Sequence, residues 1–165
     1  MPIDDPTILI VCTGNVCRSP MAEALMRHSL AQRGIAATVF SRGLAAPTGR
    51  APHPFALQTA ADFGVPIAPD KRAAQVNPVD LRLAAVVLVM DKGHRHEVQQ
   101  RFPAAGGKTF LLGHWQGEQE ILDPLQEPEA VFQAQWPVMQ AACESWVDHL
   151  LLAGMLKAPG SGSSG

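Results

Sequence analysis

One stretch near the start of the chain reads Ile8-Leu9-Ile10-Val11-Cys12-Thr13-Gly14-Asn15-Val16-Cys17-Arg18-Ser19-Pro20. Its first four residues are apolar, which is typical of a parallel strand that is buried on both faces of a sheet. From Met21 onward the apolar residues recur at helical spacing until Gly34, a residue type that commonly ends a helix. The stretch therefore predicts a strand over residues 7–12, a short loop, and a helix over residues 18–33.

The predicted loop combines features that bind phosphate. The first backbone N–H groups of a helix have no intrahelical partner, and the helix dipole adds positive potential there. Gly14 and Asn15 are residue types that readily adopt the left-handed backbone of a tight loop, and Arg18 can bind two phosphate oxygens at once. We expect a phosphate to be surrounded by seven residues, Thr13, Gly14, Asn15, Val16, Cys17, Arg18 and Ser19.

Cys12 stands at the start of this loop. A thiol beside a helix N-terminus and a guanidinium group is stabilised as the thiolate, which is the nucleophilic form of cysteine. The hydroxyl of Ser19 can donate a hydrogen bond to this sulfur. We therefore predict that Cys12 attacks the phosphorus atom of a phosphate ester bound by the loop.

Composition restricts the class of protein. The chain has 165 residues, of which 47% are hydrophobic, and a net charge of −2, which suits one domain with a substantial core. No basic block indicates nucleic acid or a membrane surface as a partner. No apolar run approaches the roughly 18 residues that span a bilayer. The acidic start, Met1 to Asp5, lacks the pattern of a signal peptide.

The three cysteines, Cys12, Cys17 and Cys143, argue against a disulfide scaffold, because their number is odd and their spacings are unrelated. The spacing of Cys12 and Cys17 is not that of a zinc-ribbon pair, and the chain has no second pair. A reactive thiolate requires a reducing compartment, so we expect the protein to be cytoplasmic.

The rest of the chain alternates between predicted strands and helices. Further strands are expected at residues 37–41, 83–90 and 108–112, and helices at 52–63, after Asn77, at 91–102 and at 128–152. This alternation predicts an α/β fold, a single three-layer domain in which a four-stranded parallel sheet carries helices on both faces. The domain is expected to cover residues 1–157, and the Gly/Ser-rich residues 158–165 to form a flexible tail.

Several side chains outside the loop are of types that often occur in functional sites, but their positions predict structural roles. His94, His96 and His114 are interpreted as solvated surface residues and not as metal ligands, since the first two face different directions on a helix. Cys143 lies in an apolar stripe and is assigned to the core. Pro137 is expected to kink or split the last helix.

The run from Cys12 to Glu23, with Cys12-x5-Arg18-Ser19-Pro20 at its centre, resembles the phosphate loop of the low-molecular-weight protein tyrosine phosphatases of bacterial type. The resemblance implies strand order 2-1-3-4 and hydrolysis of phosphotyrosine in proteins through a cysteinyl-phosphate, with no metal and no other cofactor. It also suggests that the phosphotyrosine substrate is a bacterial tyrosine kinase.

The resemblance assigns roles to two further residues. Asp123, followed by Pro124, is the expected general acid and base, although an Asp-Pro pair by itself is an ordinary turn opener. Cys17 is either a buried thiol beneath the loop or a resolving thiol that forms a reversible disulfide with oxidised Cys12. Asp91, by contrast, is expected to cap a helix and not to act in catalysis.

The chain departs from the family pattern at the rim of the expected pocket. Leu125 replaces a frequent tyrosine after the Asp-Pro pair, and Pro47 and Thr48 lie where an aromatic residue is common. Arg42 replaces a usual alanine and is expected to be a solvated surface charge. Three alternatives stay open, namely a protein-arginine phosphatase, which carries threonine at the position of Val16, an arsenate reductase, which uses further cysteines downstream, and a non-catalytic phosphoprotein-binding module.

Overall fold

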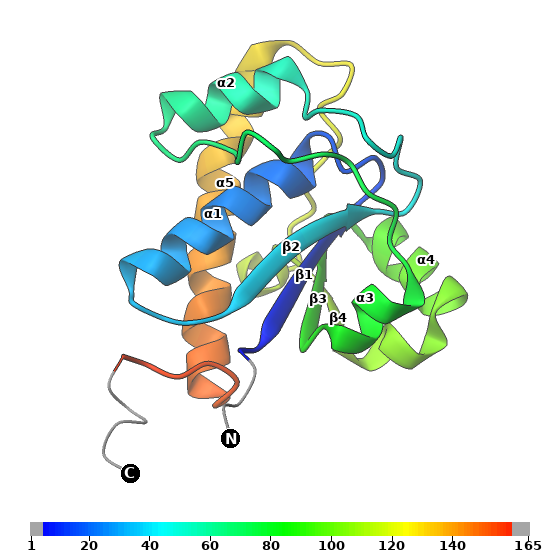
Figure 1. The fold of residues 1–165 in the computed structure, drawn as a ribbon, viewed down its shortest axis with the longest axis vertical. Helices are drawn as coiled ribbons and strands as arrows, with labels where there is room; N and C mark the ends of the chain where they lie inside the picture. Colours follow the sequence, from blue (N-terminus) through cyan, green and yellow to red (C-terminus); the bar gives the residue numbers. More distant parts are fainter. Residues whose placement is uncertain (1–4, 160–165) are drawn as a thin grey trace.

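The computed structural model describes residues 5–159, so most of the expected tail lies outside the described residues. The sheet has four parallel strands, β1 (Thr7–Cys12), β2 (Thr38–Gly43), β3 (Val86–Val89) and β4 (Thr109–Leu111). Their order is β2-β1-β3-β4 (Figure 1). The α/β class and the strand order are therefore confirmed.

The helices separate the strands along the chain. They are α1 (Arg18–Gln32), α2 (Pro54–Asp62), α3 (Pro78–Leu83), α4 (Lys92–Arg101) and α5 (Glu129–Leu152), with two short 3-10 helices, η1 (Pro103–Lys108) and η2 (His114–Gln116). The start of α3 follows the sequence signal, since Asn77 at the N-cap and Asp80 at the third helical position form a reciprocal capping box, with Pro78 in the first turn.

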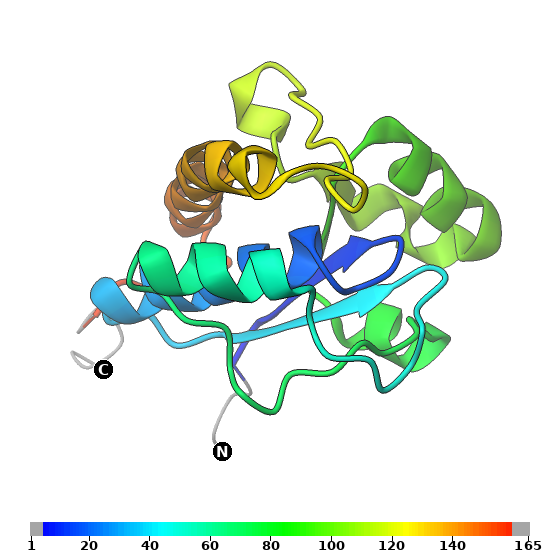
Figure 2. The same cartoon turned by 90° about the horizontal axis from the view of Figure 1, so that it is seen from above.

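Alternate residues of β1 pack against different helices. Ile8 and Ile10 belong to a core shared with α1, α2 and α5, whereas Leu9 and Val11 belong to a second core shared with α3 and α4. Figures 1 and 2 show these two groups of helices on opposite sides of the sheet. Burial of both faces explains why the strand sequence is continuously apolar.

Two expected elements differ in detail. The third strand is shorter than residues 83–90, because Leu83 ends α3 and β3 starts only at Val86. The last helix is one continuous element through Pro137, so of the two expected effects, a kink or a split, the split does not occur. Its apolar stripe packs against α1 and α2, and this packing stabilises the helix beyond what its local propensity provides.

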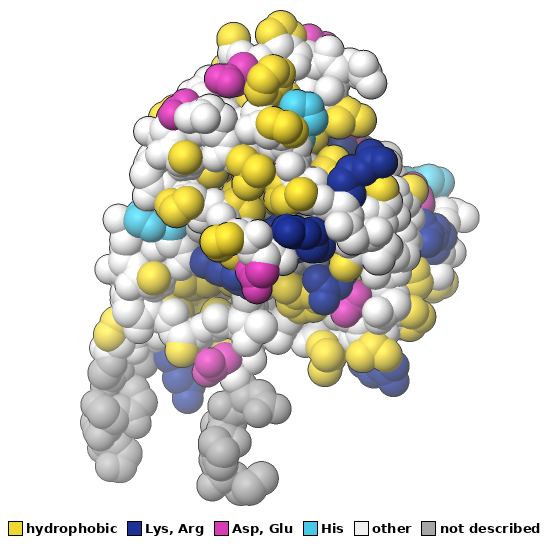
Figure 3. Space-filling view, turned by 45° about the horizontal axis from the view of Figure 1, so that its top comes forward, with side chains coloured by type: hydrophobic (Ala, Val, Ile, Leu, Met, Phe, Trp, Pro, Cys, Tyr) yellow, Lys and Arg dark blue, Asp and Glu magenta, His cyan; other side chains and the backbone are white. Residues whose placement is uncertain are grey.

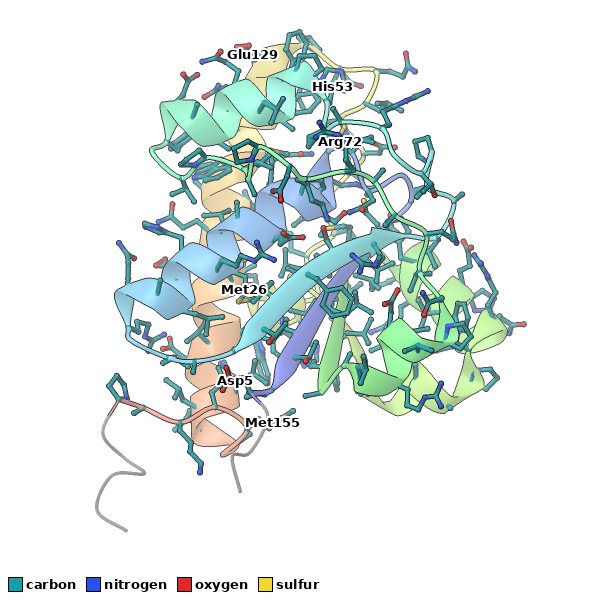
Figure 4. All side chains as sticks on the ribbon, in the orientation of Figure 1. Asp5, Met26, His53, Arg72, Glu129 and Met155 are labelled. Atoms are coloured by element: carbon teal, nitrogen blue, oxygen red, sulfur yellow. The ribbon has the colours of Figure 1, made fainter. Side chains whose placement is uncertain are left out.

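The carboxyl ends of the parallel strands meet at one end of the molecule, where the loop between β1 and α1 lies (Figure 1). Figure 4 places Arg72 and His53 at this end, and Asp5 and Met155 at the other. None of the helices within residues 5–159 combines the length and hydrophobicity that crossing a bilayer requires.

Candidate active site

The loop between β1 and α1 starts at Cys12 and ends at the first turn of α1, with Cys17 at the N-cap position. Asn15 has a φ of 56°, the left-handed conformation that its residue type tolerates. Gly43, at the end of β2, lets the loop come close to the sheet, because a Cβ atom there would lie 2.6 Å from the carbonyl oxygen of Thr13. This close approach was not foreseen from the sequence.

Two donors converge on the sulfur of Cys12. The backbone N–H of Asn15 donates to Sγ over 3.2 Å, and the hydroxyl of Ser19 lies 2.9 Å from the same atom. A hydrogen bond donated to the sulfur stabilises the negative charge that this atom carries as a nucleophile. The side chain of Cys12 is buried, yet it faces a cavity, as described below.

Asn15 links the loop to two other segments. Its amide nitrogen donates to the hydroxyls of Ser19 (2.8 Å) and Ser41 (2.9 Å), and its amide oxygen accepts from the backbone N–H of Ala74 (3.0 Å). The side chain is fully buried and uses both polar atoms. These bonds compensate for the unusual backbone conformation and fix the loop against β2 and the segment after it.

The Ser41 hydroxyl connects Asn15 to a buried ion pair between Glu23 and Lys71. It donates to Glu23 of α1 over 2.6 Å, and the same carboxylate accepts from Lys71 over 3.1 Å. Burial lowers the pKa of Lys71, while the negative charge of Glu23 acts in the opposite direction. The pair therefore ties the segment that carries Ala74 to α1 and so supports Asn15 from outside the loop.

Arg18 lies in the first turn of α1 and its side chain is only 3% exposed. One guanidinium nitrogen donates to the carbonyl oxygen of Ile121 over 2.8 Å and to Asp91 over 3.4 Å. The other nitrogen lies 3.9 Å from a carboxylate oxygen of Asp123. Asp91 caps α4, as expected, by accepting from the N–H of His94, and in addition it orients the arginine.

A cavity of about 430 Å³ opens over the loop. It is lined by Cys12, Thr13, Gly14, Val16, Cys17 and Arg18 from the loop, by Ala45, Ala46, Pro47 and Arg50 on one side, and by Asp123 and Leu125 on the other. Figure 3, in which the top of the molecule in Figure 1 is turned towards the viewer, shows Lys and Arg side chains next to apolar ones on this face. The cavity thus has a polar, cationic floor and a largely apolar rim.

Asp123 lies at the mouth of this cavity with half of its side chain exposed. One of its carboxylate oxygens accepts from the N–H of Leu125 over 3.0 Å, which fixes the turn at Pro124. Asp123 thus lines the cavity together with Arg18 and is exposed to solvent, so that it can reach the part of a phosphate ester that points outward.

Of the residues predicted for the site, the cavity is lined by Cys12, Thr13, Gly14, Val16, Cys17, Arg18 and Asp123. Asn15 and Ser19 are not among its lining residues, since both are fully buried and hydrogen-bond each other. The structure also adds residues that the sequence did not reveal, namely Ser41, Lys71, Arg50 and His94, because each lies far from the loop along the chain.

Two expectations are wrong. His94 is not a solvated surface residue but is buried, and it hydrogen-bonds Thr13. Arg42 is not a solvated charge, since it binds Asp80 over 3.2 Å and stacks on Phe40. Cys143 is buried as expected. Within residues 5–159, no three His, Cys, Asp or Glu side chains are grouped in a way that could bind a metal ion.

Residues 7–154 match the model of the low molecular weight phosphotyrosine protein phosphatases. The chain therefore belongs to this family. A protein of Erwinia amylovora named probable low molecular weight protein-tyrosine-phosphatase AmsI is 38% identical over 144 residues, which are 87% of this chain and 96% of the relative.

Two solved structures have the same fold. Vibrio vulnificus Wzb, in complex with benzylphosphonate, superposes with a TM-score of 0.81 at 30% identity, covering 89% of this chain and 100% of that one. The YwlE arginine phosphatase from Geobacillus stearothermophilus gives a TM-score of 0.81 at 32% identity, covering 90% and 94%. The chain is thus similar to proteins named for two different phosphorylated side chains.

Proposed function

We propose that the protein hydrolyses phosphotyrosine in proteins, with Cys12 as nucleophile, Arg18 and the loop amides as phosphate-binding groups, and Asp123 as general acid and base. The observation that carries the proposal is the sulfur of Cys12, which accepts from the N–H of Asn15 at 3.2 Å and opens into a cavity shared with Arg18 and Asp123. The nucleophile, the anion-binding group and the acid therefore line one cavity.

In the first step the thiolate of Cys12 attacks phosphorus. A sulfur–phosphorus bond forms while the bond between phosphorus and the tyrosine oxygen breaks. Asp123 gives its proton to the departing oxygen, and the guanidinium of Arg18 stabilises the negative charge on the remaining phosphate oxygens. The products are a dephosphorylated tyrosine side chain and a cysteinyl-phosphate.

In the second step Asp123, now a carboxylate, accepts a proton from a water molecule. That water attacks the cysteinyl-phosphate, so the sulfur–phosphorus bond breaks and inorganic phosphate leaves. The Cys12 sulfur departs as a thiolate, which the hydroxyl of Ser19 and the N–H of Asn15 stabilise as hydrogen-bond donors.

The test is hydrolysis of p-nitrophenyl phosphate by the wild type and by Cys12→Ser. We expect kcat/KM of the variant to be lower by at least about 10³-fold, because the covalent step requires the sulfur of Cys12 as nucleophile. Cys143→Ala is the matched control, because it removes a thiol that is buried away from the loop. Equal rates for the wild type and Cys12→Ser would reject the mechanism.

A protein-arginine phosphatase is the second candidate. Leu125 gives the mouth of the cavity an aliphatic wall instead of the tyrosine that is frequent in the family, and a similar structure is named an arginine phosphatase. Val16, in place of threonine, favours phosphotyrosine. Phosphotyrosine and phosphoarginine peptides of one sequence should be compared, with arsenate reduction as a third assay. We expect phosphotyrosine to give the highest kcat/KM.

The physiological context is part of the same proposal. AmsI is named a probable, and Wzb a low molecular weight, protein-tyrosine-phosphatase, and we propose that the substrate of this protein is a bacterial tyrosine kinase in the cytoplasm. Burial, followed by the charges of Asp123 and Cys12, raises the pKa of Cys17 to about 12, so Cys17 is a neutral thiol at physiological pH. Its role as a resolving thiol for oxidised Cys12 remains a proposal.

A further inference from the structure

His94 is the one buried polar side chain on a helix that is otherwise mostly exposed. Of the residues of α4, only His94 and Val98 are buried. His94 lies in the first turn of α4, shortly after the carboxyl end of β3. Its Nε2 atom is 2.9 Å from the hydroxyl oxygen of Thr13, in the loop between β1 and α1. Nothing in the mechanism above uses this contact.

The hydrogen bonds of His94 determine which ring nitrogen carries the proton. The backbone N–H of Met90 points to Nδ1 over 3.4 Å, and a backbone N–H can only donate. Nδ1 is therefore an acceptor without hydrogen, and in a neutral imidazole the hydrogen is on Nε2. Nε2–H must then donate to the hydroxyl oxygen of Thr13.

Thr13 is fixed from two sides as a result. Its side chain accepts from His94, and its carbonyl oxygen accepts from the N–H of Ala45 over 2.9 Å. The same helix start also binds the far end of the loop, because Asp91 contacts Arg18. The N-terminus of α4 thus contacts both the second residue and the last part of the phosphate-binding segment.

We propose that His94 is a positioning residue for the phosphate-binding loop, which it orients by donating a hydrogen bond from Nε2 to Thr13. The inference rests on the proposed function, since it concerns how the same loop receives phosphate. Without this bond the backbone around Thr13 gains freedom, and part of the free energy of phosphate binding is used to order it again.

The test measures the dissociation constant of inorganic phosphate by calorimetry, together with kcat and KM for p-nitrophenyl phosphate. His94→Leu keeps the volume and removes the donor, and we expect phosphate binding to weaken roughly five- to tenfold, as for one lost hydrogen bond. His94→Gln presents an amide donor near the position of Nε2 and should recover binding to within about twofold. His96→Leu, at an exposed position of the same helix, is the control.

A double-mutant cycle with Thr13→Val checks the partner. If the two residues act through one bond, the double variant should bind phosphate no more weakly than the worse single variant. Additive losses would overturn the proposal, as would equal phosphate affinity in His94→Leu and wild type. Thermal melts of each variant identify a mere loss of fold. If His94→Leu does not fold, Thr13→Val decides, because it removes the acceptor while His94 stays in place, and unchanged phosphate affinity in this variant would overturn the proposal.

The two proposals fail in different ways. Phosphate binding requires no turnover, so a wild-type protein that binds phosphate but hydrolyses no ester would reject the proposed function and leave the positioning role of His94 testable. Normal hydrolysis with unchanged phosphate affinity in His94→Leu would reject only the positioning role.

Discussion

Arg18 makes contacts that a lysine could not reproduce. Its guanidinium binds the Ile121 carbonyl and Asp91 with one nitrogen and lies near Asp123 with the other. Because these groups fix the plane of the guanidinium, its remaining donors are oriented before the phosphate arrives. The residue thus combines a positive charge with a geometry that is set by two neighbouring segments.

Arg18→Lys should therefore lose most activity although the charge is retained. We expect kcat/KM for p-nitrophenyl phosphate to fall by at least about 10²-fold, because an ammonium group cannot form the bidentate contact. Arg82→Lys, at an exposed position of α3, is the matched control. Near-normal turnover of the Arg18 variant would contradict bidentate phosphate binding.

Asp123→Asn should separate proton transfer from phosphate binding. The amide keeps the shape of the side chain but cannot transfer a proton to the leaving oxygen. We therefore expect the rate of hydrolysis of esters with poor leaving groups to fall by roughly 10²–10⁴-fold. Esters with good leaving groups should be affected less in the first step. Stopped-flow kinetics on both substrate types measures this difference, and a loss below about threefold on phosphotyrosine would assign the acid to another residue.

Helix α5 shows how an element tolerates a residue that disfavours it. Pro137 is exposed and has no N–H to donate within the helix, yet the helix continues through it. On the opposite side, Phe132, Trp136 and Met139 are buried against the core. The burial of these large side chains outweighs one missing hydrogen bond.

Pro137→Ala should accordingly stabilise the protein. Alanine restores the backbone donor and the helical propensity, and we expect the free energy of unfolding to rise by about 1–3 kcal/mol, less a contribution from the more flexible unfolded chain. Urea unfolding measures the change, with Gln140→Ala at an exposed position of the same helix as control. A decrease in stability would mean that the proline fits a local distortion that the helix needs.

At the scale of the whole molecule, the buried His94 connects stability to pH. Burial, followed by the positive charge of Arg18, lowers its pKa below 6.5, although the carboxylates of Asp91, Glu97 and Asp123 act in the opposite direction. The unfolded chain therefore binds a proton at this residue at higher pH than the folded protein does. The contribution to stability is complete above about pH 6.5 and is lost as the pH falls through the folded pKa.

His94→Gln removes this titration. Between pH 7.5 and 5.5 the wild type should lose more free energy of unfolding than the variant, with a limiting difference of about 1.4 kcal/mol per pH unit. The other histidines are present in both proteins and cancel in the comparison. Urea titrations at several pH values measure the difference, and parallel curves would contradict a depressed pKa.

How much could be predicted from the sequence differs between the loop and its surroundings. The strand, the loop and the helix start are contiguous, so periodicity and residue type were sufficient to place Cys12 and Arg18. Asp123 was found only through the family resemblance, because an Asp-Pro pair has many ordinary uses. His94 was misjudged because helical spacing alone does not reveal that α4 turns this residue towards the loop.

The sequence by itself determined the class of fold and the chemistry of the loop, since both depend on residues that are neighbours in the chain and on the burial of an apolar strand. The tertiary structure alone decided which distant groups contact the loop and Arg18, namely Ser41, Asp91, His94 and the carbonyl of Ile121. The physical reason is that buried polar groups require partners at hydrogen-bond distance. Only the packing of the sheet and its helices determines which side chains reach that distance.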